Sequence, residues 1–134
     1  MAAVAALFSA VAGTGWLFLR AWLPWITPRG DGSWSLGSKS RFVRGTATLL
    51  RRAKAIVVHD DDGLHAMSAI CTHENCLVHD LPAKKEIICP CHGSVFTYRG
   101  DVKRGPASAP LVWLALSVEG DELVLDPGKE VPRG

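Results

Sequence analysis

The sequence CTHENC at residues 71–76 is followed closely by CPCHGS at residues 89–94. The two motifs contain all 4 cysteines of the chain and two of its 5 histidines. A disulfide framework that staples a whole domain spreads its cysteines along the chain, so this clustering indicates one local site. Each motif has a cysteine and a histidine at the spacing of metal ligands, and each has one cysteine to spare.

Two thiolates and two imidazoles suit more than one metal centre. They form a valid tetrahedral zinc set. They also form the set in which two histidines replace two cysteines on one iron of a [2Fe–2S] cluster. Attachment of c-type haem requires two residues between the cysteines that precede the histidine, and the second motif has one, which excludes haem. A catalytic cysteine–histidine pair leaves three cysteines without a role.

The motifs resemble those of the Rieske iron–sulfur protein family, whose pattern is C-T-H-x-x-C followed by C-P-C-H-G-S. GPASAP at residues 105–110 is similar to the proline-containing loop that covers the cluster in this family, and its Gly105 and Pro106 are expected beside the cluster. The resemblance extends from Leu36 to about Asp126. It suits the Rieske proteins of cytochrome bc1/b6f-type quinol oxidoreductase complexes. A structural zinc site remains as an alternative, although zinc explains neither the spare cysteines nor the proline loop.

The resemblance implies a Rieske-type [2Fe–2S] cluster with four ligands: Cys71, His73, Cys89 and His92. The thiolates are expected to bind a buried iron, and the imidazoles an outer iron near the surface. The remaining cysteines, Cys76 and Cys91, are expected to form a disulfide that joins the two cluster-binding loops, at about residues 71–96. In the chain-entropy model, a disulfide that closes a loop of this length adds roughly 3 kcal/mol to the free energy of unfolding.

An iron held by imidazoles suits coupled transfer of an electron and a proton. Two neutral imidazoles leave the cluster less negative than two thiolates do, and therefore easier to reduce. Each ring also keeps a second nitrogen that can carry a proton. The resemblance implies that His73 or His92 hydrogen-bonds a quinol hydroxyl and accepts its proton.

The two residues that follow His73 depart from the family pattern, which has leucine and then glycine at these positions. Asn75 takes the glycine position, and because asparagine tolerates a left-handed backbone, we expect the turn to persist. Glu74 takes the leucine position. It puts an acidic side chain on the tip that serves as an apolar docking surface in the family.

The N-terminal sequence predicts a membrane anchor. Residues 2–19 are uncharged and mostly apolar, and as a helix they would span about 27 Å, close to the roughly 30 Å hydrocarbon core of a bilayer. Trp16, Trp22 and Trp25 gather at the far end, as in an interfacial aromatic belt. We therefore expect one transmembrane helix over residues 1–26. A signal peptide, which needs a basic start, and a buried core helix are the alternatives.

The rest of the chain predicts a linker and an all-β head. Residues 27–40 are rich in glycine, serine and proline, which favours a flexible linker. Residues 41–134 are expected to form the Rieske domain, a small antiparallel sandwich or barrel with a cluster-binding subdomain. Short apolar runs predict hairpins around three turns: DDDG at 60–63, RGD at 99–101 and EGD at 119–121.

These features together predict an electron-transfer subunit. The net charge of +2 gives no basic field for nucleic acid. The resemblance implies a redox subunit of a membrane quinol–cytochrome c oxidoreductase of the bc type, not active alone. Its expected partners are quinol, a cytochrome b-like quinol-binding subunit, a c-type cytochrome as acceptor, and membrane lipid. A disulfide implies an oxidising compartment, so we expect the head on the periplasmic (positive) side.

Two other carriers stay open as alternatives. One is the Rieske subunit of another membrane or periplasmic oxidoreductase, such as an arsenite-oxidase-like enzyme, which Glu74 and the short chain keep in view. The other is a soluble Rieske ferredoxin of an oxygenase system. Such ferredoxins usually lack both the spare cysteine pair and the anchor.

Phe96 predicts a comparatively low redox potential. High-potential members of the family have a tyrosine there, which donates a hydrogen bond to a cysteine sulfur, and phenylalanine has no donor. Ser94 matches the family serine whose hydroxyl donates to a cluster sulfide. We therefore expect a midpoint potential below that of ubiquinol-oxidising relatives, which suits a lower-potential quinone such as menaquinone. A redox titration followed by EPR measures it, and a midpoint at the top of the Rieske range would contradict this prediction.

Overall fold

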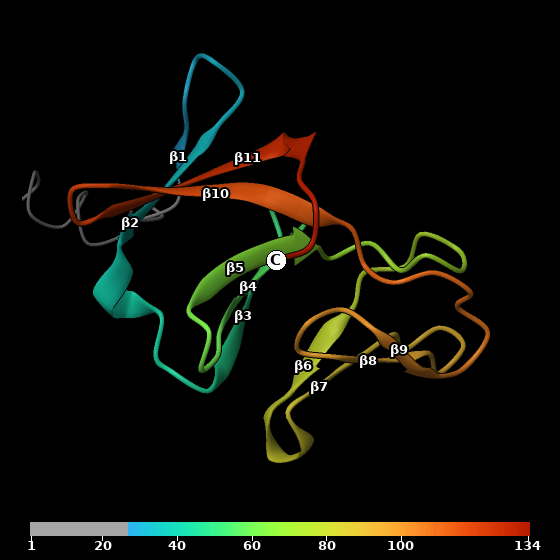
Figure 1. Ribbon diagram of the computed structural model, residues 1–134. Coiled ribbons are helices and arrows are strands. Elements are labelled where there is room, and N and C mark those ends of the chain that lie inside the picture. Colours follow the sequence, from blue (N-terminus) through green and yellow to red (C-terminus); the bar gives the residue numbers. More distant parts are fainter. Residues whose placement is uncertain (1–26) are drawn as a thin grey trace, which may run out of the picture.

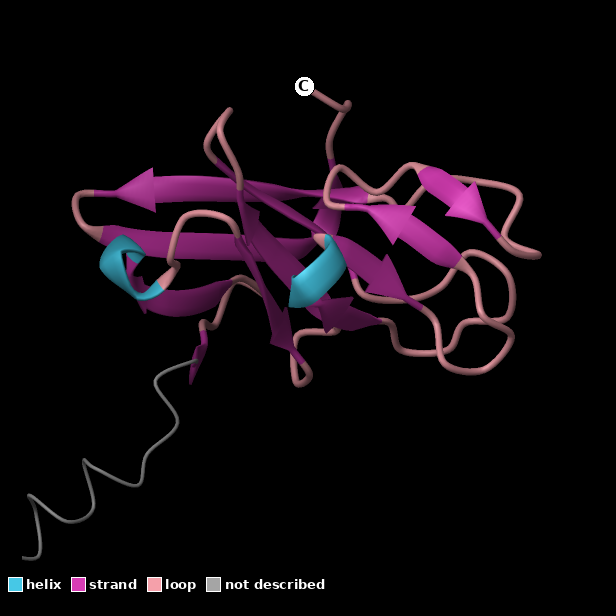
Figure 2. Cartoon of the chain, turned by 90° about the horizontal axis from the view of Figure 1, so that it is seen from below, coloured by secondary structure: helices cyan, strands magenta, loops and turns pink. Residues whose placement is uncertain are grey.

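The computed structural model describes residues 27–134, which form two antiparallel sheets (Figures 1 and 2). The larger sheet has the strand order β1-β2-β11-β10-β5-β4-β3 and the smaller one β6-β7-β8-β9. The strands of the larger sheet are β1 (Thr27–Pro28), β2 (Trp34–Ser38), β3 (Thr46–Leu50), β4 (Ala55–His59), β5 (Leu64–Ser68), β10 (Trp113–Glu119) and β11 (Glu122–Glu130). The smaller sheet consists of β6 (His79–Leu81), β7 (Glu86–Ile88), β8 (Val95–Thr97) and β9 (Val102–Arg104). Two single-turn 3₁₀ helices are η1 (Lys39–Arg41) and η2 (Pro82–Lys84).

The three predicted hairpins are confirmed: β4–β5, β8–β9 and β10–β11. Local side-chain bonds explain two of them. The carboxylate of Asp60 accepts from the backbone N–H groups of Asp62 and Gly63, an Asx-type turn that closes β4–β5. The hydroxyl of Thr97 accepts from the N–H groups of Arg99 and Asp101 and closes β8–β9 in the same way.

Strand β4 is buried on both faces and joins two cores. Ile56 and Val58 belong to the core between the two sheets, which also receives residues of β7 and β8. Ala55 and Val57 point the other way, into a core enclosed by the larger sheet itself. Because successive side chains of a strand alternate between its faces, this continuous apolar run suits a strand that is covered on both sides.

The smaller sheet is an insertion between two paired neighbours of the larger sheet. Strands β5 and β10 pair directly, with Met67 opposite Trp113, and the backbone N–H of Ser68 donates to Val112 O at 2.8 Å where the chain leaves and returns. Residues 69–112 therefore project from one point of the larger sheet, as Figure 1 shows at its lower right. Both cysteine motifs and the proline loop lie within this insertion.

The flexible linker expected over residues 27–40 differs from the structure. Strands β1 and β2 lie there, and β2 pairs with β11, placing Ser35 opposite Val124. The side chain of Leu36 is 0% exposed and lies in the core of the larger sheet. The glycine and serine content indicates a linker, but the pairing of β2 with β1 and β11 and the burial of Leu36 hold this segment in the sheet. The ordered head therefore begins before residue 41.

The expected transmembrane helix over residues 1–26 lies outside the described residues. Within residues 27–134, no helix has the length and apolar character needed to cross a bilayer. The anchor helix thus stays a prediction.

The burial of Leu36 predicts that β2 contributes to the stability of the head. Leu36→Ala removes a fully buried side chain and is expected to lower the free energy of unfolding by about 2–5 kcal/mol. The matched control is Val43→Ala, at a side chain that is 64% exposed, where a change within about 0.5 kcal/mol is expected. Urea unfolding of the full chain measures both. Equal, small effects would show that residues 34–38 do not belong to the folded unit.

Candidate metal centre

The first cysteine motif folds into a tight loop closed by its own backbone. The N–H of Cys71 donates to Cys76 O at 2.8 Å, and the N–H of Asn75 donates to Cys71 O at 3.0 Å. Asn75 has φ +55°, the left-handed conformation expected from its side chain. The turn predicted at this position is therefore confirmed, although asparagine stands where the family has glycine.

The second motif repeats the same closure with different residues. The N–H of Cys89 donates to Ser94 O at 2.8 Å, and the N–H of Gly93 donates to Cys89 O at 3.0 Å. Gly93 has φ +73° and so occupies the place that Asn75 takes in the first loop. Each loop thus begins with a cysteine, turns through a left-handed residue four positions on, and closes at the fifth. The two cysteines that begin the loops, Cys71 and Cys89, are buried and free.

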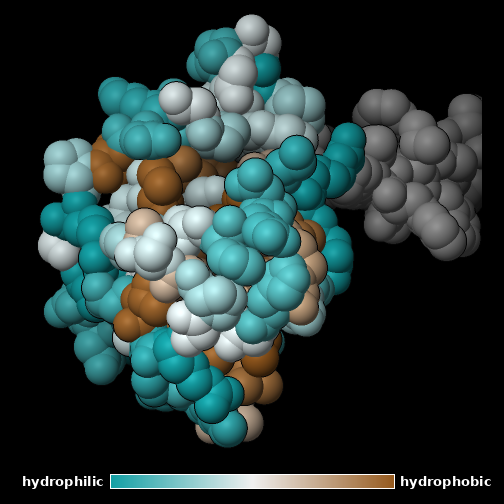
Figure 3. Space-filling model, turned by 90° about the vertical axis from the view of Figure 1, so that its right-hand side faces the viewer, coloured by the Kyte–Doolittle hydropathy of each residue, from teal (hydrophilic) through white to brown (hydrophobic). Residues whose placement is uncertain are grey.

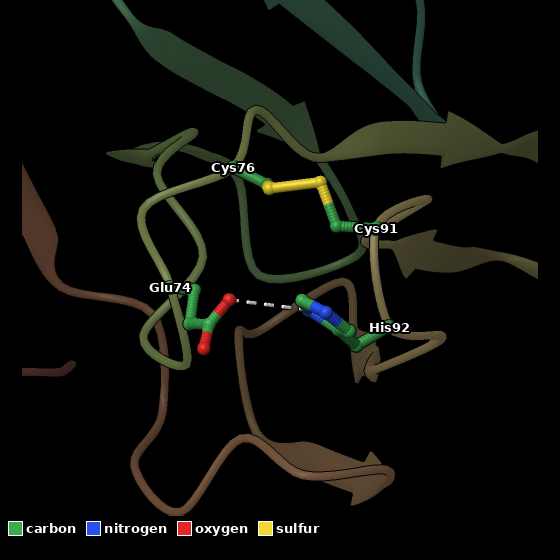
Figure 4. The surroundings of a disulfide bond; sticks show 4 residues. All are labelled: Glu74, Cys76, Cys91 and His92. Carbon is green, nitrogen blue, oxygen red and sulfur yellow. Dashed lines mark ion pairs between the residues drawn. A yellow bond between two sulfur atoms is a disulfide. The ribbon is translucent and has the colours of Figure 1, made fainter.

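A disulfide joins the loops, as predicted. Cys76 and Cys91 are bonded, with their Cα atoms 6.5 Å apart (Figure 4). This bond removes two cysteines from any ligand set and leaves the thiols of Cys71 and Cys89. The sulfur of Cys89 lies within 4.8 Å of both disulfide sulfurs, so the tie between the loops lies directly beside the buried thiols.

The two free thiols lie next to each other in a protected environment. Cys71 is 0% and Cys89 2% exposed. Burial raises the pKa of the Cys89 thiol, the adjacent Cys71 thiol raises it further, and the backbone N–H groups of Cys91 and His92 oppose the shift. N–H donors aimed at a sulfur stabilise a thiolate, which is the form that binds metal.

The two histidines of the motifs lie together at the surface. The rings of His73 and His92 meet edge to face, with centroids 4.9 Å apart, and both side chains are exposed. A carboxylate oxygen of Glu74 lies 3.7 Å from Nδ1 of His92, and Figure 4 shows the two side chains pointing toward each other from different loops. Sequence reasoning placed Glu74 at the tip but missed this contact, since nothing in the spacing of the motifs shows how their tips face.

The proline loop is bonded to both cysteine loops. The N–H of Ala107 donates to Ser94 Oγ at 3.1 Å, and the hydroxyl of Thr72 donates to Ala109 O at 2.6 Å. Gly105 lies so close to the second loop that an added Cβ would be 2.5 Å from the Cα of Ser94. Thr72 was missed as a structural residue. Its hydroxyl within the first motif was the available signal.

The residues expected to surround the cluster ligands provide one of the two hydrogen-bond donors found in high-potential members of the family. Ser94 and Phe96 are both fully buried. The hydroxyl of Ser94 accepts from Ala107 and keeps its own hydrogen to donate. The one tyrosine of the chain, Tyr98, follows β8 and does not replace the missing hydroxyl at position 96. Tyr98 donates to the carboxylate of Asp80 at 2.8 Å, and burial together with this bond raises the pKa of Tyr98 above its usual range.

The donor set fits a [2Fe–2S] cluster with mixed ligands. Two adjacent buried thiols offer soft ligands to one iron, and two neighbouring imidazoles at the surface offer nitrogen ligands to another. A disulfide and a proline loop hold the two loops in register around them. A family model described as the Rieske [2Fe-2S] domain matches residues 36–119.

The chain belongs to the Rieske [2Fe–2S] domain family. The predicted cofactor, a Rieske-type [2Fe–2S] cluster, is thereby confirmed.

Relatives of this Rieske chain are iron-sulfur subunits of cytochrome b6-f complexes. The cytochrome b6-f complex iron-sulfur subunit of Chlorobaculum thiosulfatiphilum is 39% identical over 72 residues, which cover 54% of this chain and 40% of that protein. The corresponding subunit of Synechococcus sp. WH7803 is 36% identical over 119 residues, covering 87% of this chain and 57% of the relative. The chain thus spans about half the length of these relatives.

A solved structure shares both sequence and fold. The cyanobacterial plasma membrane Rieske protein from Synechocystis PCC 6803 is 28% identical, with a TM-score of 0.54. The match covers 68% of this chain and 96% of that one. The similarity therefore extends over nearly the whole of that solved chain.

The contact at Gly105 predicts a glycine requirement that goes beyond backbone conformation. Gly105→Ala is expected to lower the free energy of unfolding by about 1–3 kcal/mol beyond the cost of placing alanine at a positive φ, because the new Cβ overlaps the second loop. The matched control is Gly63→Ala: Gly63 has φ +125°, near the +105° of Gly105, with nothing within 4 Å of an added Cβ. Urea unfolding and the visible absorbance of the cluster measure the outcome. Equal costs at both positions would contradict the packing argument.

Proposed function

We propose that this chain is the electron-transfer subunit of a bc-type quinol oxidoreductase, in which it takes one electron from quinol and passes it to a cytochrome. The observation that carries the proposal is the arrangement of the donor set, with the thiols of Cys71 and Cys89 buried and the imidazoles of His73 and His92 in contact with each other at the surface of the same two loops. Because the thiols are buried, a partner reaches such a site at its exposed imidazole end. The similarity to cytochrome b6-f iron-sulfur subunits supports the same role.

The protein's own groups divide the work. Cys71, Cys89, His73 and His92 hold the cluster, which when bound supplies a one-electron acceptor whose reduction favours protonation of its imidazole ligands. The exposed histidines hydrogen-bond the quinol hydroxyl and hold its proton. The buried side of the site excludes water from the sulfurs, and the hydroxyl of Ser94 is placed to donate a hydrogen bond there.

The membrane setting belongs to the same proposal. Residues 1–26 form the anchor, so that lipid is a partner, and the head faces the periplasmic side, since the Cys76–Cys91 disulfide requires an oxidising compartment. A cytochrome b-like subunit binds the quinol, and a c-type cytochrome receives the electron. Menaquinol fits best, because Phe96 lacks the hydroxyl that raises the potential in high-potential relatives.

Low-temperature EPR of the dithionite-reduced full chain tests the proposal, followed by reduction of the oxidised chain with menaquinol in its complex. A Rieske-type signal and a quinol-driven appearance of that signal are expected. Zinc in place of iron would leave only a structural metal site. A normal signal that quinol does not produce would favour a Rieske subunit of another oxidoreductase or a ferredoxin.

The ligand assignment predicts the effect of single substitutions. Cys89→Ser and His92→Ala are expected to abolish the Rieske signal, since each removes one of four iron ligands. The control is His79→Ala on β6, a histidine outside both motifs, which is expected to leave the signal unchanged. Iron content and EPR of the purified variants provide the measurement. A Rieske spectrum retained without either ligand would refute the assignment.

A further inference from the structure

The surface around the exposed histidines has a single carboxylate. We call this surface the tip and define it as residues 72–75, 90–93 and 105–110, most of which are exposed. Glu74 is the one acidic residue among them, and the tip contains no lysine or arginine. Figure 3 looks onto this end of the molecule, where hydrophilic and intermediate residues cover most of the face and hydrophobic residues form separate small patches.

The carboxylate of Glu74 lies beside the two exposed histidines, His73 and His92. It is 3.7 Å from Nδ1 of His92, and the two side chains are 63% and 48% exposed. Within residues 27–134, the ion pair with His92 is the one that Glu74 makes. The turn at Asn75 and the disulfide hold the first loop against the second, so the backbone that carries Glu74 stays beside His92.

A partner that contacts His92 therefore comes within reach of the Glu74 carboxylate. Burying a carboxylate without a partner is costly, whereas a buried carboxylate paired with a cation can favour binding. The imidazole of His92 does not offset the full charge, because its contact at 3.7 Å is longer than a charge-assisted hydrogen bond. The compensating charge must come from the partner.

We propose that Glu74 is a specificity-determining residue, which selects a docking site with an arginine or lysine beside the position that receives His92. The inference rests on the proposed function and adds the chemistry of the partner's surface to it. Arginine suits this site best, because its planar guanidinium pairs with a carboxylate in a bidentate manner. An apolar docking site would instead be disfavoured by an unpaired charge.

Two substitutions at Glu74 distinguish a cationic docking site from an apolar one. In the full complex, Glu74→Gln and Glu74→Leu are both expected to slow quinol-driven reduction by at least about tenfold at low salt and to flatten its dependence on ionic strength. If the docking site were apolar, Glu74→Leu would instead reach or exceed the native rate, and the proposal would be overturned.

The matched control is Glu119→Gln, which removes the same charge from the β10–β11 turn. Glu119 is 57% exposed and pairs with Arg29, far along the chain from both cysteine motifs. This variant is expected to keep the native rate and salt dependence. If it slowed reduction as much as Glu74→Gln did, total charge and not the tip would be responsible, and the proposal would fail.

A second readout uses small oxidants and needs no partner. Hexaammineruthenium(III), a cation, and ferricyanide, an anion, each take one electron from the dithionite-reduced full chain. Glu74→Gln is expected to lower the ratio of the cation rate to the anion rate several-fold, while Glu119→Gln leaves it unchanged. An unchanged ratio with an intact Rieske EPR signal would overturn the inference alone. Absence of the signal from the native chain would overturn the proposed function.

Discussion

The antiparallel pairing of β5 with β10 is the constraint on which the site depends. It closes the larger sheet across the point where residues 69–112 leave and return, and Met67 and Trp113, which face each other in this pairing, both enter the core between the sheets. The smaller sheet is thereby anchored at the point where residues 69–112 leave and rejoin the larger sheet. Its loops can turn outward and carry exposed histidines without loosening the larger sheet, because the hydrophobic contacts that hold the insertion lie behind them.

Within the insertion, the two cysteine loops share one backbone conformation but carry their histidines at different positions. Each buries its first cysteine and turns through a left-handed residue, Asn75 in one loop and Gly93 in the other. The histidine stands two positions after the cysteine in the first loop and three after it in the second. Despite this offset the two imidazole rings meet at the surface, with centroids 4.9 Å apart. The disulfide and the bonds from Thr72 and Ala107 then fix the approach.

The sequence predicted the local features well and the long-range ones poorly. The hairpins at residues 60–63, 99–101 and 119–121 were predictable because their turns are specified by adjacent residues. The disulfide and the cofactor were implied by the resemblance of the two cysteine motifs to the Rieske family. Strand β2 was missed because its short run is held by one buried leucine and by β11, which is almost ninety residues away. The bond from Tyr98 to Asp80 was beyond reach for the same reason, since it depends on how β6 and β8 are arranged in the smaller sheet.

Position 74 shows how a chain can keep the motifs of its family and still present a different surface beside them. The side chains that hold the metal are specified by its chemistry, and the turn that carries them requires only a residue that accepts a left-handed backbone, which Asn75 supplies. Neither requirement reaches Glu74, whose side chain points out of the loop toward His92. The residue at position 74 is therefore restricted by the surface of the docking partner and not by the metal or the turn. Because a carboxylate is expensive to bury alone, its presence beside the exchanging imidazole carries information about the partner that the ligands themselves do not.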